Sequence, residues 1–182
     1  MRSSYNKTDI TYGELIQSIT QITNPKKIVE IGILDGYSLK SFIQSANITT
    51  EICAYDLFDD FNGNHSDKNT LIEKFKDFSN VKIEYGDFYK LHNLINNVDI
   101  LHIDIANNGD VFEFVINNYF NLLSPNGIIL FEGGSIDRDN VEWMIKYDKP
   151  KINPIIEKYQ ALNFDIKIYG TFPSITIITN KK

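Results

Sequence analysis

Two hydrophobic periods alternate along the chain. Short runs rich in Ile and Val, typical of buried strands, are separated by stretches whose apolar residues recur every three or four positions, as on one face of a helix. The strand pattern predicts strands at 27–31, 51–55, 81–85, 99–104, 127–131, 164–169 and 174–179. The helical pattern predicts helices before Asn24-Pro25, at 36–46, near 70–78, and at 88–95, 111–123, 137–147 and 153–162. This order favours strand-helix-strand units and therefore a mostly parallel sheet.

Local signals refine these elements. Leu15, Ile16, Ile19 and Ile22 form one apolar stripe of the first helix, and Leu71, Ile72, Phe75 and Phe78 form one on the helix near 70–78. Thr70 and Glu73 have the spacing of a capping box. Residues 124–127 (Ser-Pro-Asn-Gly) predict a turn, and Pro150 and Pro154 predict breaks between helical segments. The polar loop at 59–69 is expected to have a mobile tip.

The last two strands are joined differently from the others. Only a few residues around Gly170 and Pro173 separate them, too few for a crossover helix, so they are expected to pair as an antiparallel hairpin. We therefore predict an α/β fold with a doubly wound, Rossmann-like sheet of seven strands, mostly parallel and closed by a C-terminal antiparallel hairpin strand. The 182 residues form one domain in this interpretation, with a helical segment at 1–24 and a core at 25–182.

Charge and cysteine content narrow the function classes. The chain has 18 Lys and Arg against 24 Asp and Glu, a net charge of −6, which argues against a nucleic-acid partner. Cys53 is the only cysteine, so neither a disulfide framework nor a cysteine-rich zinc site is expected. No run approaches the roughly 18 to 20 apolar residues of a membrane span, and we expect a cytoplasmic protein.

The richest motif is residues 29–38, where the first strand passes into its helix. Gly32 and Gly36 permit a tight turn close to a ligand, Ser38 and the helix amides offer hydrogen-bond donors, and Glu30 can accept from a cationic amine. Leu34 stands where a dinucleotide fingerprint requires glycine, which favours a ligand without pyrophosphate. The alternative is a plain glycine-bearing turn.

Acidic residues follow the second and third strands at the same expected edge of the sheet. Asp56 lies where a carboxylate can bind the ribose hydroxyls of a nucleoside, and Leu57 and Phe58 could clamp an adenine. Asp87 could accept from an adenine amino group or, equally, cap the next helix. A solvated loop carboxylate remains the alternative for Asp56.

The fourth and fifth strands supply the candidates for catalysis. His102 and Asp104 share a face, with Asp104 nearer the ligand edge and His102 open to a purely structural role in the core. Glu132 would face Asp104 from the next strand, and the two could hold a divalent cation, so a metal is left open. Residues 135–143 would contact an acceptor.

Together these motifs resemble class I S-adenosylmethionine-dependent methyltransferases. Glu30-Ile31-Gly32 and Gly36-Tyr37-Ser38 are similar to the first motif of small-molecule O-methyltransferases of the caffeoyl-CoA and catechol type, residues 122–127 to the turn into the fifth strand, and residues 99–104 to the fourth-strand motif. The resemblance implies cofactor-binding roles for Glu30, Gly32, Ile33, Gly36, Tyr37, Ser38, Asp56, Leu57, Asp87, Phe88 and Asp104.

The resemblance also has departures. Glu132-Gly133 stands where the metal-dependent catechol type has Asp-Asn, and Ile105-Ala106-Asn107 follows Asp104 without the usual acidic residue and histidine. The resulting hypothesis is methyl transfer from S-adenosylmethionine to an oxygen of a small acceptor, a sugar or phenolic hydroxyl, with Asp104, His102 or Glu132 as the base. The alternatives are a non-catalytic module that binds S-adenosylmethionine or S-adenosylhomocysteine and, disfavoured by Leu34 and the hairpin, an NAD-dependent oxidoreductase. A homodimer is left open.

Overall fold

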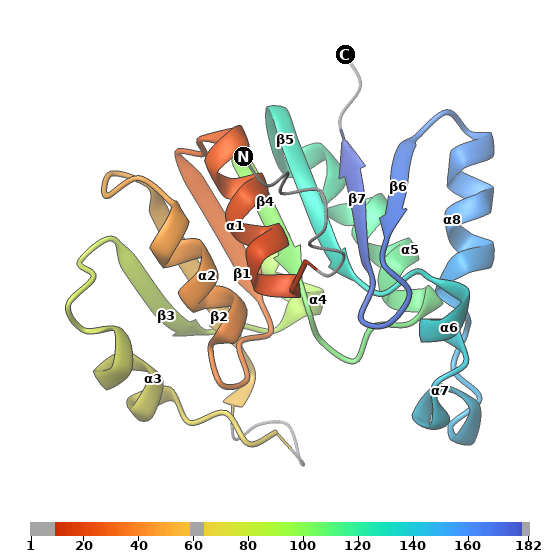
Figure 1. Ribbon diagram of the computed structural model, residues 1–182, viewed down its shortest axis with the longest axis horizontal. Helices are drawn as coiled ribbons and strands as arrows, with labels where there is room; N and C mark the ends of the chain where they lie inside the picture. Colours follow the sequence, from red (N-terminus) through yellow and green to blue (C-terminus); the bar gives the residue numbers. More distant parts are fainter. Residues whose placement is uncertain (1–9, 59–63, 180–182) are drawn as a thin grey trace, which may run out of the picture.

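A seven-stranded sheet lies between two layers of helices (Figure 1). The computed structural model describes residues 10–58 and 64–179. The strands follow the order β3-β2-β1-β4-β5-β7-β6, and only β7 runs antiparallel to the other six. Their bounds are β1 (Lys27–Ile31), β2 (Glu51–Asp56), β3 (Val81–Tyr85), β4 (Val98–Ile103), β5 (Leu123–Glu132), β6 (Asp165–Tyr169) and β7 (Ile175–Thr179). The predicted fold class is confirmed, including the closing hairpin.

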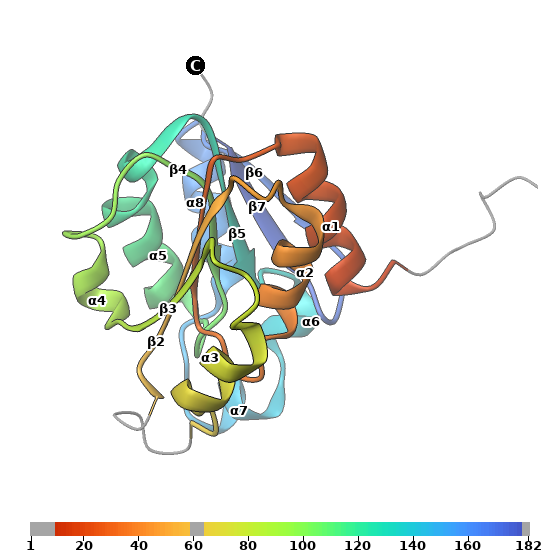
Figure 2. The ribbon, with the colours of Figure 1, turned by 90° about the vertical axis from the view of Figure 1, so that its left-hand side faces the viewer.

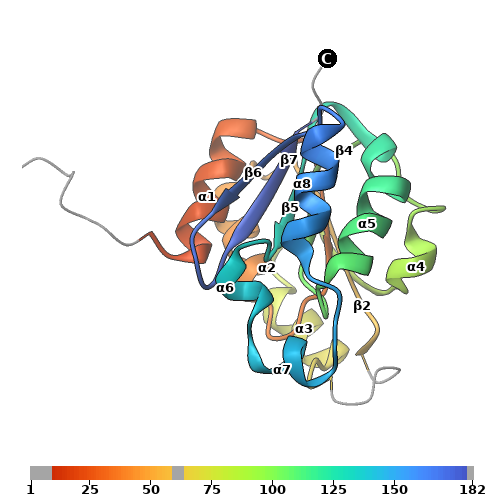
Figure 3. The same cartoon turned by 90° about the vertical axis from the view of Figure 1, so that its right-hand side faces the viewer.

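The helices divide between the two faces of the sheet, as the edge-on views show (Figures 2 and 3). One face carries α1 (Tyr12–Thr23), α2 (Tyr37–Ser45) and α3 (Lys68–Phe75). The other carries α4 (Phe88–Leu91), α5 (Gly109–Asn118) and α8 (Ile152–Ala161). The short helices α6 (Ile136–Asp139) and α7 (Glu142–Lys146) lie beyond the end of β5, and a 3-10 turn covers Phe120–Leu122.

The alternation of side chains along the strands builds two separate cores. Val29 and Ile31 of β1 pack with the α5 side, whereas Ile28 packs with Ile16 of α1 and Phe42 of α2. Each fully buried apolar side chain of this size contributes roughly 1.5 to 3 kcal/mol to folding. Two buried polar residues, Glu30 near the end of β1 and His102 near the end of β4, interrupt the apolar α1 side of the sheet. They belong to the site described below.

Three local predictions about the helices on the first face are wrong. Ile22 is 86 % exposed, because the buried residues of α1 are Gly13, Ile16 and Thr20, and Ile22 lies outside the face that they form. Ile72 and Phe78 are also exposed, and only Leu71 and Phe75 of the predicted stripe are buried.

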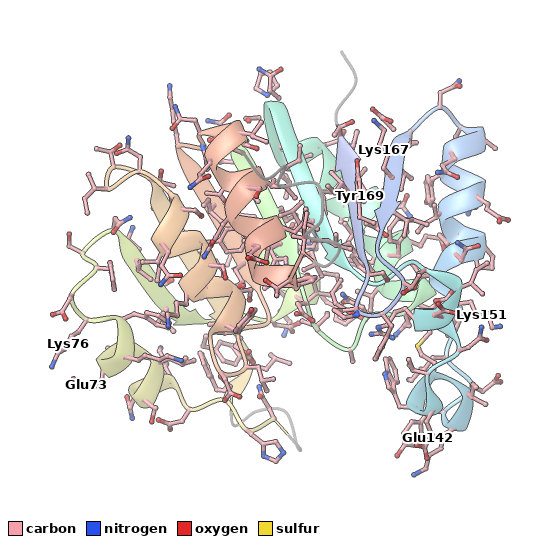
Figure 4. The ribbon with its side chains drawn as sticks, viewed as in Figure 1. Glu73, Lys76, Glu142, Lys151, Lys167 and Tyr169 are labelled. Carbon is pink, nitrogen blue, oxygen red and sulfur yellow. The ribbon has the colours of Figure 1, made fainter. Side chains whose placement is uncertain are left out.

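The cap of α3 differs from the predicted capping box as well. Asp67 is the N-cap and accepts from the backbone N–H of Thr70 at 2.6 Å, so the helix starts earlier than predicted. Glu73 instead lies on the outer surface of α3, where it pairs with Lys76 (Figure 4). The predicted mobile tip of the preceding loop falls on 59–63, outside the described residues.

The predictions around β5 and the last helices also need correction. Residues 124–127 are not a turn before β5 but an excursion within it, because Val98 pairs with Leu123 and Ile100 with Ile128. The predicted helix at 111–123 ends at Asn118, and that at 137–147 is divided into α6 and α7. Pro154 does not break a helix, because it lies in the first turn of α8, where no intrahelical N–H bond is needed. No helix in 10–58 or 64–179 is long and apolar enough to cross a bilayer.

Candidate functional site

The turn from β1 into α2 depends on its glycines. Gly32 has φ +92°, and a Cβ atom there would lie 1.9 Å from the carbonyl oxygen of Asp104. Gly36 has φ +74° and serves as the N-cap of α2 without a side-chain hydrogen bond to the helix, so the first amides of α2 have no side-chain cap. Leu34 is exposed and adopts φ +48°. The glycines are therefore required by the fold, and the turn presents the uncapped end of a helix.

Asp56 lies at the end of β2, as predicted, but its carboxylate binds the protein itself. Oδ2 accepts from the N–H of Ile33 at 2.7 Å, and Oδ1 accepts from the N–H of Phe58 at 3.2 Å and from the side-chain amide of Asn64 at 2.6 Å. The residue is buried. Asp56 thus ties the turn after β1 to the segment after β2.

The other predicted cofactor residues occupy varied environments. Asp87 is the N-cap of α4 and forms an ion pair with Lys90 at 3.0 Å, a contact that lowers the pKa of Asp87. Phe88 is buried and stacks on Tyr119, with ring centroids 5.4 Å apart. Tyr37 is exposed, Leu57 is half-buried, and Ile33 and Ser38 are buried. For Phe88 and Ile33 a contact with a ligand would have to involve the backbone.

A pocket of about 540 Å³ opens at the carboxyl edge of β4 and β5. It combines charged side chains with an apolar rim contributed by α1, the region of α6 and α7, and the turn between β6 and β7. Its lining residues are Tyr12, Asp104, Ile105, Ala106, Glu132, Arg138, Val141, Trp143, Phe172 and Pro173. This volume falls within the range of small-molecule sites, about 300 to 1,000 Å³.

Glu132 and Arg138 form a partly buried, bidentate ion pair in this pocket. Arg138 Nε and Nη2 donate to Oε1 and Oε2 of Glu132, each at 2.8 Å. The centroid of the Trp143 ring lies 5.3 Å from the guanidinium carbon, and Nη1 of Arg138 is buried without a hydrogen-bond partner. Both oxygens of Glu132 are therefore occupied, whereas one donor group of Arg138 is not. In the part of the chain described, no three His, Cys, Asp or Glu side chains gather as a metal site would require.

Asp104 is the carboxylate open to the pocket. Burial of its surroundings, together with the charges of Glu132 and Glu30, raises the pKa of Asp104 to about 6, although His102 opposes the shift. Near neutral pH Asp104 is still ionised, but the folded protein stabilises this charge less than water does.

This shift predicts a pH-dependent effect of Asp104→Asn. The protonated carboxyl and the amide are both neutral below pH 4. The charge penalty of the wild type grows as the pH rises from about 4 to about 6, because the unfolded chain loses the proton first, and it is complete above 6. We expect the variant to gain melting temperature relative to wild type at pH 7 but not at pH 4, measured by calorimetry. Asp110→Asn, at an exposed position outside the pocket, is the control. An equal gain at both pH values would contradict the shift.

His102 and Glu30 lie side by side beneath α1 on neighbouring strands. Nδ1 of His102 is 3.0 Å from Oε1 of Glu30, and Nε2 is 2.9 Å from the hydroxyl of Tyr12. Both His102 and Glu30 are fully buried, and Oε2 of Glu30 has no hydrogen-bond partner. Burial disfavours the charged imidazole, but the hydrogen bond and charge of Glu30 prevail and raise the pKa of His102. The three groups form a chain from the pocket wall into the core.

The structure therefore brings together only part of the predicted site. Asp104 and Glu132 line one pocket, whereas His102 reaches it only through Tyr12. Sequence reasoning missed Tyr12, which precedes the apolar stripe of the first helix, and the particular role of Arg138. A signal for Arg138 existed, because the chain has only two arginines beside sixteen lysines, and arginine is the residue suited to bidentate contacts.

Comparisons with known proteins show which solved structures share this architecture. No family model and no curated protein matches the chain. Solved structures do match it. Methyltransferase PaMTH1 of Podospora anserina, solved with S-adenosylhomocysteine, has a TM-score of 0.68 at 20 % identity, over 100 % of this chain and 83 % of that one.

Two further structures agree. TomG of Streptomyces achromogenes, an O-methyltransferase of tomaymycin synthesis solved with S-adenosylmethionine, has a TM-score of 0.68 at 12 % identity, covering 97 % and 83 %. An O-methyltransferase of Bacillus cereus, solved with S-adenosylhomocysteine, has a TM-score of 0.66 at 16 % identity, covering 96 % and 84 %.

The chain has the methyltransferase fold. At these identities the likeness establishes the architecture and not the reaction, because one fold carries many activities. Within the methyltransferase fold, the pocket described above lies at the carboxyl edge of the sheet, where open α/β sheets bind their ligands.

Proposed function

We propose that this protein transfers the methyl group of S-adenosylmethionine to a hydroxyl oxygen of a small molecule. The observation that carries the proposal is the pocket at the carboxyl edge of β4 and β5, with an open carboxylate beside the glycine turn of β1. The methyltransferase fold supports it. When bound, the cofactor supplies an electrophilic methyl group attached to a positively charged sulfur.

The residues present fit such a cofactor. The uncapped first turn of α2 offers amide donors for a carboxylate, and the charge of Asp104 suits the sulfonium and the ammonium group. Asp56 would bind the ribose after releasing Asn64. Asp87, Tyr37, Ser38 and Leu57 remain further proposed contacts, as do the backbones of Ile33 and Phe88.

The pocket also indicates the kind of acceptor. Val141, Trp143, Phe172 and Pro173 provide apolar surface, and the guanidinium group of Arg138 contributes a positive charge. An acceptor with a flat apolar body and an oxygen beside its reacting hydroxyl would use both. Because Arg138 engages both oxygens of Glu132, we also propose that a divalent metal is not needed, so that a chelator leaves turnover unchanged.

Calorimetric titration with S-adenosylmethionine and S-adenosylhomocysteine tests the cofactor site. Wild type is expected to bind both, and Asp56→Asn to bind at least about tenfold more weakly, a loss of roughly 1.4 kcal/mol. Asp99→Asn is the matched control, because Asp99 likewise accepts from backbone amides, those of Lys26 and Lys27, but at the opposite edge of the sheet.

Each other outcome has a defined meaning. Absence of binding to either ligand would overturn the proposal, and binding of NAD in their place would favour an oxidoreductase. Binding without methylation of any phenolic or sugar hydroxyl tested would favour a binding module that does not turn over.

A further inference from the structure

The hydrogen-bonded chain Glu30–His102–Tyr12 has no evident structural necessity. A buried ionisable pair is costly to desolvate, and an apolar pair of similar size would fill the same space. Yet both hydrogen bonds of this chain are formed: Oε1 of Glu30 lies 3.0 Å from Nδ1 of His102, and Nε2 of His102 lies 2.9 Å from the hydroxyl of Tyr12. Only Tyr12 among the three lines the pocket.

The fold fixes Tyr12 at this position. It is the first residue of α1, and the preceding Thr11 forms a capping box with Glu14, whose N–H donates to Thr11 Oγ1 at 3.2 Å and whose Oε2 accepts from the N–H of Thr11 at 3.0 Å. His102 is held from the other side by the edge of Phe42, with ring centroids 5.5 Å apart. Neither ring needs to move for a proton to pass between them.

The direction of transfer follows from the charges nearby. In the neutral tautomer of His102 that donates from Nδ1 to the Glu30 carboxylate, the lone pair of Nε2 faces the hydroxyl of Tyr12. Burial, with the charges of Asp104, Glu132 and Glu30, raises the pKa of Tyr12 well above its ordinary value, so a tyrosinate would not persist. The phenol is thus suited to pass a proton on rather than to lose one.

We propose that Tyr12 is a catalytic residue that relays the proton of an aromatic hydroxyl acceptor to His102, with Glu30 positioning the imidazole. This inference rests on the proposed methyl transfer and names its acceptor class. The acceptor O–H gives its proton to the phenol oxygen of Tyr12 while the proton of Tyr12 passes to Nε2 of His102. The acceptor oxygen bonds to the methyl carbon as the carbon–sulfur bond breaks, and that electron pair stays on sulfur. The positive charge lost at sulfur is then carried by the imidazolium beside Glu30.

An aromatic hydroxyl fits this relay better than a sugar hydroxyl. A neutral imidazole can take a proton from a phenol with a modest penalty, whereas an aliphatic hydroxyl is a far weaker acid. Trp143 and Phe172 supply the surface on which an aromatic ring can stack.

The test uses the protein loaded with S-adenosylhomocysteine and the aromatic probe 2-naphthol, whose ionised form has its own absorbance. The pKa of this probe lies well above that of an imidazole, so the neutral ring of His102 is available to accept a proton at the working pH. At a pH one unit below the pKa of the free probe, wild type is expected to hold at least about tenfold more ionised probe, relative to neutral probe, than Tyr12→Phe does. The control is Tyr169→Phe, on the exposed edge strand β6, and it should match wild type (Figure 4). Nitrogen-15 NMR of the His102 ring should show a proton on Nδ1 before the probe binds and on both nitrogens afterwards.

The outcomes separate this inference from the proposed function. Failure of S-adenosylhomocysteine to bind would overturn the proposed function. With the cofactor product bound, equal ionisation in wild type and Tyr12→Phe, an unchanged His102 ring, or no binding of the probe would overturn the relay. Unchanged binding of S-adenosylhomocysteine by Tyr12→Phe would show that this variant is folded.

Discussion

Gly32→Ala is expected to destabilise the protein strongly, although the substitution replaces only one hydrogen atom by a methyl group. The backbone of Gly32 has φ +92°, and the new Cβ would lie 1.9 Å from the carbonyl oxygen of Asp104. Backbone strain of roughly 1 to 3 kcal/mol and overpacking of a similar size together predict a loss of about 4 kcal/mol in the free energy of unfolding. Urea denaturation followed by circular dichroism measures this loss.

Gly13→Ala provides the matched control. Gly13 lies in α1, and a Cβ there would meet the hydroxyl groups of Ser41 and Tyr37 at 2.9 Å, the ends of side chains that can shift. Alanine also favours the helix by about 1 kcal/mol, so the net change should stay within about 1 kcal/mol. A loss below about 1 kcal/mol for Gly32→Ala would mean that β1 and β4 separate more easily than the structure indicates.

Glu30→Leu is expected to cost about 3 kcal/mol in the free energy of unfolding, because it leaves His102 buried without its partner. Adding His102→Met removes the remaining polar group and should bring stability back to within about 1 kcal/mol of wild type, since an apolar pair of similar size avoids desolvation. The hydroxyl of Tyr12 stays at the pocket, where water can bind it. Chemical denaturation of both single variants and the double variant gives the coupling energy.

The result of this cycle bears on why the pair exists. Recovery in the double variant would indicate that Glu30 and His102 are kept for chemistry rather than for stability. If the double variant is instead less stable than Glu30→Leu alone, the hydrogen bonds of His102 are themselves structural supports, and the case for a relay weakens.

The strands were predictable because their pattern is local. The bounds of β1 and β3 agree with the predicted ones. β1 is a run buried on both faces, whereas β3 is an edge strand in which only Ile83 is buried, and its alternating pattern is equally local. The errors at Ile22, Asp67 and residues 124–127 depend on tertiary contacts. Ile22 lies on a helix that touches its neighbours over less than the whole apolar stripe, and the excursion in β5 is set by pairing with β4.

The candidate site was predictable only along the strand ends. Asp56, Asp104 and Glu132 follow from the rule that parallel strands meet at one edge, and the structure places Asp104 and Glu132 in one pocket. The partners of these residues were not predictable. Arg138 lies 6 residues from its partner Glu132 in the sequence, and Asn64 lies 8 residues from Asp56. Tyr12 lies 90 residues from His102. No sequence period connects the members of these pairs.

The side-chain amide of Asn64 occupies Oδ1 of Asp56 and therefore competes with any ligand for this oxygen. A nucleoside that binds Oδ1 of Asp56 has to replace the 2.6 Å hydrogen bond from Asn64. Because Asn64 belongs to the same molecule, its effective concentration at Asp56 is fixed. The apparent dissociation constant is then the intrinsic one divided by the fraction of molecules in which the contact is open. Under the proposed function this contact would also favour a ligand with ribose hydroxyls, because a ligand that offers Asp56 no hydrogen bond leaves the contact to Asn64 in place.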